Sequence, residues 1–111
     1  MHTNPEIEAI AQAIKNAVPA ERIYLFGSYT YGTPHKDSDY DFFVVIPDET
    51  MRPIEAMQRA QGAIRDRNRA IDVLANTRSG FEKRKTWVAS IEKTVNQKGV
   101  LLYDGRSRRV A

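Results

Sequence analysis

Residues 27–41 read Gly-Ser-Tyr-Thr-Tyr-Gly-Thr-Pro-His-Lys-Asp-Ser-Asp-Tyr-Asp, a Gly-Ser pair followed by a spacer of ten residues and an Asp-x-Asp motif. Because side chains two residues apart on a strand point to the same side, Asp39 and Asp41 can hold one metal ion together. Gly27 and Ser28 follow the apolar segment 22–26. Backbone N–H groups at such a strand-to-loop turn can face an anionic phosphate. The stretch therefore predicts a site at which a metal ion and a phosphate meet.

A third carboxylate is expected, because two Asp side chains alone supply few ligands for a divalent ion. Asp72 is the candidate, because it stands inside the apolar segment 70–74, whose β-branched residues predict a buried strand that carries one charge. If this strand lies beside Asp39 and Asp41, carboxylates about 5 Å apart repel by roughly 3 kcal/mol per pair at an effective dielectric near 20. A bound cation would relieve this repulsion.

The residue types at this site restrict the metal. Oxygen ligands suit Mg²⁺ or Mn²⁺, whereas a chain with no Cys and only two His is a poor source of zinc ligands. Acidic residues alternate over 37–41 as in a calcium-binding loop, but that loop requires Gly at its sixth position, where this chain has Phe42.

Simpler interpretations remain open for each part of the motif. Residues 37–41 could form only a polar turn before a buried strand, and the Gly-Ser pair could form only a loop. Asp72 could be the internal salt-bridge partner of an arginine. These alternatives compete with the metal site until the strands are placed.

The same residues resemble the minimal nucleotidyltransferase domains of the DNA polymerase beta superfamily. The resemblance rests on the Gly-Ser pair, its ten-residue spacer, the Asp-x-Asp motif and the later Asp72, and Gly32 is similar to the family pattern too. It extends from the helix before the first strand to the closing segment 99–103. It implies an α/β (α+β) fold with a single mixed β-sheet and packed helices, the polymerase beta-like palm.

The resemblance also implies an enzyme that moves a nucleoside monophosphate from a nucleoside triphosphate to a hydroxyl group and releases pyrophosphate. Asp39 and Asp41 would ligate two Mg²⁺ ions, with Mn²⁺ as the alternative. Asp72 would bind the ion that activates the acceptor hydroxyl and would take its proton. Ser28 and the amides around Gly27 would hold the outer phosphates.

One departure from the family pattern concerns the residues after the Gly-Ser pair. Family members often carry an Arg there, whereas this chain has Tyr29, Thr30 and Tyr31. Two interpretations stay open for the two tyrosines: contact with a base or a protein partner, or packing.

Free-standing domains of this size resemble the antitoxin half of toxin–antitoxin pairs whose partner is a HEPN-domain ribonuclease toxin. On this resemblance we expect the chain to use ATP and Mg²⁺ to attach AMP to a tyrosine of a cognate HEPN toxin, which would block RNA cleavage. One alternative is a non-catalytic antitoxin that neutralises its partner by binding alone. Another is a small-molecule nucleotidyltransferase of the aminoglycoside-modifying kind, which usually has an added helical domain.

Length and charge agree with a small domain that acts on a partner. The 111 residues predict one domain. The resemblance implies that the nucleotidyltransferase domain spans 1–104, which leaves a basic tail over 105–111 that we expect to be disordered. The net charge of +3 suits a nucleotide or an acidic partner surface, and direct binding of nucleic acid is not expected. No apolar run of about 18 residues and no signal peptide is evident, so we expect a cytoplasmic protein without membrane contact.

Hydrophobic periodicity predicts the order helix, strand, strand, helix, strand, helix, strand. The first helix begins at Pro5, and the two strands that follow span 22–26 and 40–46. The next helix begins at Pro53, and a strand around Asp72 follows it. The last helix is expected to be long and to end at Gly99. The apolar stripes expected on the three helices are Ile7, Ile10, Ile14 and Val18; Ile54, Met57, Ala60 and Ile64; and Phe81, Val88, Ile91 and Val95.

Overall fold

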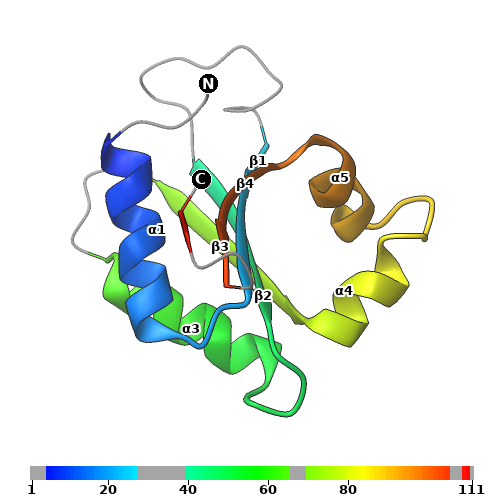
Figure 1. Cartoon of the computed structure of the whole chain (residues 1–111), viewed down its shortest axis with the longest axis horizontal. Coiled ribbons are helices and arrows are strands. Elements are labelled where there is room, and N and C mark those ends of the chain that lie inside the picture. Colours follow the sequence, from blue (N-terminus) through cyan, green and yellow to red (C-terminus); the bar gives the residue numbers. More distant parts are fainter. Residues whose placement is uncertain (1–4, 28–39, 66–69, 106–108, 111) are drawn as a thin grey trace.

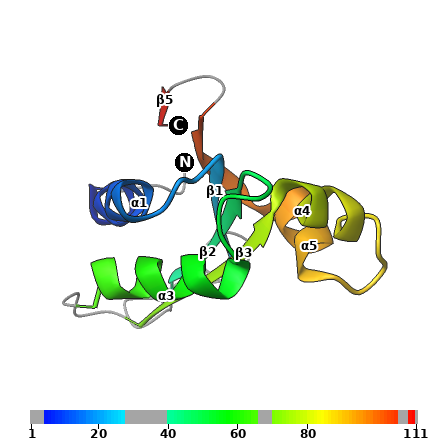
Figure 2. The same cartoon turned by 90° about the horizontal axis from the view of Figure 1, so that it is seen from below.

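The computed structural model of the chain describes residues 5–27, 40–65, 70–105 and 109–110, and a mixed β-sheet is its middle layer. Helices α1 (Pro5–Ala17) and α3 (Pro53–Ala63) cover one face of the sheet. Helices α4 (Arg78–Arg84) and α5 (Ile91–Lys98) cover the other face (Figures 1 and 2). The predicted α+β architecture, a single mixed sheet with helices packed on it, is confirmed.

The sheet has the strand order β3-β2-β1-β4-β5. Its strands are β1 (Arg22–Phe26), β2 (Tyr40–Ile46), β3 (Ile71–Thr77), β4 (Val100–Asp104) and β5 (Arg109–Val110). Strands β2 and β3 are parallel and are joined through α3, whereas the other neighbouring strands are antiparallel. The bounds of β1 and β2 are those predicted from the sequence.

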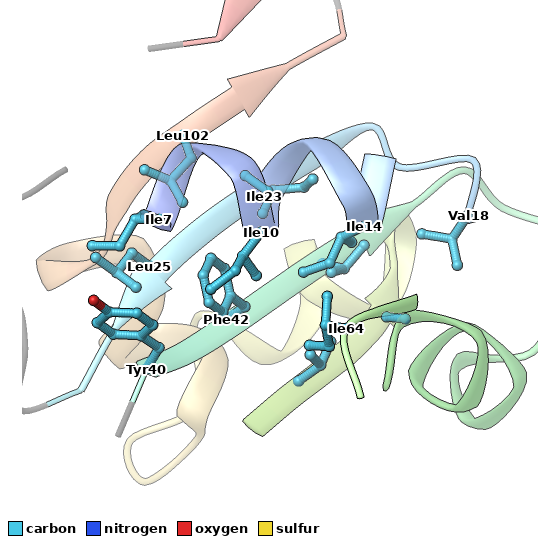
Figure 3. Packing of buried hydrophobic residues seen from close by; sticks show 14 of the residues in the cluster. Ile7, Ile10, Ile14, Val18, Ile23, Leu25, Tyr40, Phe42, Ile64 and Leu102 are labelled. Atoms are coloured by element: carbon cyan, nitrogen blue, oxygen red, sulfur yellow. The ribbon is translucent and has the colours of Figure 1, made fainter. Parts of the chain in front are cut away.

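Alternation along β2 assigns its side chains to two cores. Phe42, Val44 and Ile46 pack with α1 and α3, where the predicted stripe of α1 is fully buried (Figure 3). Phe43 and Val45 point the other way and pack with the residues of α4 and α5. A strand that is apolar at every position in this stretch is typical of a sheet covered on both faces, as the sequence predicted.

The expected single long helix after β3 is wrong, because two helices stand in its place. Helix α4 begins directly after β3, where the Thr77 side chain accepts a hydrogen bond from the Gly80 N–H. The chain then turns, and the Ser90 hydroxyl accepts a hydrogen bond from the Lys93 N–H to begin α5. Each of these caps begins a helix of its own, and Val88 lies on the turn between the two helices, where it is 89% exposed instead of buried.

One smaller expectation also needs correction. Ile54 is 48% exposed, because Ala56 and Ala60 form the buried face of α3 and Ile64 is buried directly after it. Beyond residue 104, β5 pairs with the edge of β4. The disorder expected for the tail stays a prediction. The boundary of the domain at residue 104 remains a prediction. In the described segments, every helix falls short of the length and apolarity that a bilayer crossing would need.

Candidate active site

Asp41 on β2 and Asp72 on β3 are direct partners in the parallel register of these two strands. Partners on neighbouring strands, which lie about 4.8 Å apart, project to the same face of the sheet. Asp41 alternates with Phe42 and shares its side with Phe43, so this face is the one covered by α4 and α5. The adjacency of the Asp72 strand and the Asp41 strand, expected from the sequence, is therefore present.

The start of β2 is held on two sides, which fixes the position of Asp41. The Tyr40 hydroxyl donates a hydrogen bond of 2.8 Å to Glu6 Oε1 on α1. The Tyr40 N–H donates one of 3.1 Å to the Ala70 carbonyl, directly before β3. The tyrosine ring is buried in the core of α1 and α3 (Figure 3). The neighbouring carboxylate thus stands on a strand end that cannot slide without breaking these bonds.

Asp72 is exposed, and the expectation that it lies on a buried strand is wrong. The cause is the position of β3, which is the first strand in the order of the described sheet and so has β2 as its only neighbour there. Asp41 is partly buried, because β2 lies between β1 and β3. An edge carboxylate beside a sheltered one leaves the pair accessible to an incoming molecule.

Gly27 forms the third side of this arrangement. Phe26 is the register partner of Asp41, so the chain leaves β1 at the level of the carboxylate. Gly27 has a φ of +85°, a backbone conformation that side chains with a Cβ rarely adopt. A Cβ at this position would lie 2.2 Å from Asp41 Oδ2, which is far inside contact distance. Only glycine allows the turn after β1 to approach the carboxylate this closely.

Residues 28–39, among them Ser28, Tyr29, Tyr31 and Asp39 of the sequence argument, lie outside the described residues. Within the described segments no group of three His, Cys, Asp or Glu side chains comes together to hold a metal ion. The pair that does come together is Asp41 and Asp72. Its carboxylate oxygens are the donors that hard divalent cations prefer. Asp39 precedes Asp41 by two residues in the sequence, and its role stays a prediction.

A second cluster of charged residues, which the sequence analysis missed, lies at the opposite end of the sheet. A cavity of about 600 Å³ there is lined by Arg22, Asp48, Arg78, Ser79, Glu82 and Asp104. Hydrogen bonds from the Ser79 N–H and hydroxyl lower the pKa of Asp48. Lys85 and then Arg22 lower the pKa of Glu82. No spacing in the sequence could reveal this cluster, because its members come from the start of β1, the turn after β2, helix α4 and the end of β4.

The sequence model for the family described as nucleotidyltransferase domain matches residues 7–102. The chain belongs to this family. The match begins within α1 and ends within β4, and it includes Gly27, Asp41 and Asp72. A comparison with functionally curated proteins gives no match.

Solved structures share the fold of this nucleotidyltransferase domain. A Sulfolobus solfataricus protein described as a nucleotidyltransferase is similar with a TM-score of 0.64 and 21% identity, over 94% of this chain and 81% of the other. A toxin–antitoxin structure with AMP-PNP gives 0.56 and 24%, over 91% and 74%. A toxin–antitoxin MntA-HpeT mutant, in which two aspartates are changed to glutamate, gives 0.54 and 24%, over 86% and 71%. At these identities the likeness establishes the fold of the domain.

Proposed function

We propose that this nucleotidyltransferase domain transfers AMP from ATP to a tyrosine hydroxyl of a cognate HEPN ribonuclease toxin and thereby acts as its antitoxin. The observation that carries the proposal is the shared register of Asp41 and Asp72, with Gly27 against the Asp41 carboxylate. Similar structures that are toxin–antitoxin complexes, one of them with AMP-PNP, support the choice of partner and nucleotide.

The donor set of the site fits a divalent metal ion. Asp41 and Asp72 project carboxylates to one face of the sheet from adjacent strands, and we assign Asp39 to the same set. These three residues would hold Mg²⁺, as two ions, with Mn²⁺ as the alternative. When bound, the metal supplies charge neutralisation at the phosphates and makes the acceptor hydroxyl easier to deprotonate.

The residues of the chain then have distinct tasks in the transfer. The backbone N–H groups at Gly27 and Ser28 bind the β- and γ-phosphates, because a turn with no Cβ lets a phosphate approach the backbone. The acceptor oxygen attacks the α-phosphorus, the bond to the bridging oxygen breaks, and pyrophosphate leaves. Asp72 accepts the hydroxyl proton, because its exposed position at the strand edge can be reached by a side chain of another protein. Asp41 is partly buried, so its carboxylate would keep its position as a metal ligand during the transfer. Because the substrate is ATP, the proposal also implies a cytoplasmic reaction.

The test is the intact mass of the protein encoded beside this chain after incubation with this chain, ATP and Mg²⁺. We expect a gain of one or more AMP units, and we expect Asp41→Asn to abolish it. Asp48→Asn is the matched control, since it changes a carboxylate at the opposite end of the sheet. A tight complex without a mass gain would instead establish an antitoxin that acts by binding alone. The absence of both a mass gain and a complex would contradict the proposal and would favour a small-molecule acceptor.

A further inference from the structure

Trp87, Val88 and Ile91 form an exposed apolar patch on the connection between α4 and α5, here called the 87–91 patch. The three residues are 45%, 89% and 40% exposed. The other exposed large apolar residue in the described part of the chain is Ile54 on α3, at 48%. Three such residues within five positions are more than the single exposed apolar residues that are normal on a protein surface.

The backbone and the tryptophan ring of this patch are held in place. The Trp87 N–H donates to the Arg84 carbonyl, and the Ser90 N–H donates to the Trp87 carbonyl at 3.2 Å. The Arg84 guanidinium lies 4.5 Å from the centre of the Trp87 ring and is itself bound to Glu92 Oε1 at 3.1 Å. Contacts of this kind reduce the entropy that a surface loses when a partner binds it.

The charges around the patch are predominantly positive toward solvent. Lys83 is exposed, and Lys93 is partly exposed on the first turn of α5. Glu92 is only 5% exposed, and its carboxylate is bound by Arg84 and Asn76, so its charge is directed into the protein. Glu82 is bound by Lys85 and Arg22. An apolar centre with a basic rim is complementary to an apolar groove with an acidic rim.

The location of the patch relates it to the candidate active site. Helices α4 and α5 pack on Phe43 and Val45, which point to the same face of β2 as Asp41. Both views place the connection of α4 and α5 at the margin of the molecule, far from α1 and α3 (Figures 1 and 2). A protein bound there would lie on the side of the sheet that carries Asp41 and Asp72.

We propose that the 87–91 patch is the docking surface for the acceptor protein, which would present an apolar groove with an acidic rim. This inference rests on the proposed function, because it assumes that the acceptor is a protein. A protein is favoured over a nucleic acid because Val88 and Ile91 are aliphatic, and because Arg84 already covers the Trp87 ring.

The experiment measures the affinity of this chain for the protein encoded beside it, by calorimetry. We expect Val88→Asp and Trp87→Ala each to raise the dissociation constant by about tenfold or more, as for central interface residues. Val88 is 89% exposed, so its replacement leaves the fold intact. Ile54→Asp is the matched control, because Ile54 is an aliphatic residue that is 48% exposed but lies on α3, and it should bind like the wild type.

The same series separates this inference from the proposed function. Asp41→Asn should bind the acceptor normally but fail to transfer AMP. Val88→Asp should transfer AMP with a raised KM and an unchanged kcat. If both patch variants bind as tightly as the wild type, or if the wild type forms no complex, the docking proposal is wrong. It is also wrong if the patch variants lose affinity for a single-stranded RNA but not for the protein. If Asp41→Asn still transferred AMP, the assignment of the active site would be wrong, whereas the docking proposal would stand.

Discussion

Gly27 and Asp41 are packed so closely that a Cβ on the glycine would lie 2.2 Å from the Asp41 Oδ2 atom. The same glycine has a φ of +85°, so two independent constraints exclude a side chain there. The register of β1 and β2 fixes the backbone of Asp41, and its Cβ would lie 3.2 Å from the added Cβ, so an alanine at position 27 would force the carboxylate to rotate away. The turn after β1 and the carboxylate on β2 therefore depend on each other.

Gly27→Ala should lower both stability and activity. The left-handed conformation costs a residue with a Cβ about 1–2 kcal/mol, and the clash with Asp41 adds to this. We expect the free energy of unfolding to fall by at least about 1 kcal/mol and AMP transfer to fall by at least about tenfold. Denaturant titration and initial rates measure the two effects.

The control for this change is Gly62→Ala. Gly62 lies in α3, and a Cβ there would meet only Arg65 Nη2, at 3.5 Å. Because alanine is the better helix former, this variant should be as stable as the wild type or more stable by about 0.5–1 kcal/mol. An equal loss in both variants would show that the position of Gly27 beside Asp41 is unimportant.

Local patterns predicted most of the fold. The bounds of β1 and β2 and the buried stripe of α1 followed from apolar runs and helical spacing, because each pattern lies within one element. The break between α4 and α5 did not follow. It depends on the Ser90 cap, whose hydroxyl could equally lie on the polar face of one continuous helix. A single serine in an amphipathic pattern does not distinguish these two cases.

The candidate site could be predicted in part. The lone acid inside the apolar segment 70–74 led to Asp72, and β2 and β3 do place it beside Asp41. The exposure of Asp72 could not be predicted, because the apolar residues around it suit a central strand as well as an edge strand. The order of strands in a sheet is set by contacts between distant segments, which hydrophobic periodicity does not encode.

Asp72→Asn should separate metal binding from folding. Asp72 is exposed, so its removal should change the free energy of unfolding by less than about 0.5 kcal/mol without metal. In the wild type, Mg²⁺ with a non-hydrolysable ATP analogue at about 100 times the dissociation constant should stabilise the fold by about 2.7 kcal/mol. Thermal unfolding with Mg²⁺ and with EDTA measures the difference. The variant should lose most of this gain, and a full gain would exclude Asp72 as a ligand.

Acid should weaken the fold through Asp48 and Glu82. Hydrogen bonds from Ser79 lower the pKa of Asp48 from its usual 3.8, and Lys85 followed by Arg22 lowers the pKa of Glu82 from its usual 4.5. A carboxyl with a lowered pKa in the folded state stabilises the fold above its unfolded value, and this contribution is lost as the pH falls through the folded value. We expect the melting temperature to decrease below about pH 4.5.

The variant Glu82→Gln tests this assignment. It should be less stable than the wild type near pH 7, and the two melting temperatures should converge in acid, because both side chains are then neutral. Because Glu82 is exposed, the difference in stability between the variant and the wild type should be small. A constant difference at every pH would show that Glu82 acts through packing instead of charge.

Arg84→Ala should be more harmful than its partly exposed side chain suggests. Glu92 is 5% exposed, and its carboxylate accepts hydrogen bonds of 3.1 Å from Arg84 Nε and of 3.1 Å from Asn76 Nδ2. Removal of the guanidinium leaves a buried charge with one neutral partner. We expect a loss of about 2–3 kcal/mol in the free energy of unfolding, because a buried charged acceptor loses its ionic donor.

The double variant Arg84→Ala with Glu92→Gln decides whether the charge is the cause. Since glutamine has nearly the same volume and no charge, it should need no cationic partner. The double variant should recover about 1–2 kcal/mol relative to Arg84→Ala. Chemical unfolding of the four proteins gives the coupling energy. A coupling near zero would assign the loss to the contact between Arg84 and the Trp87 ring, and the emission of Trp87, the single tryptophan of the chain, would then change in both arginine variants alike.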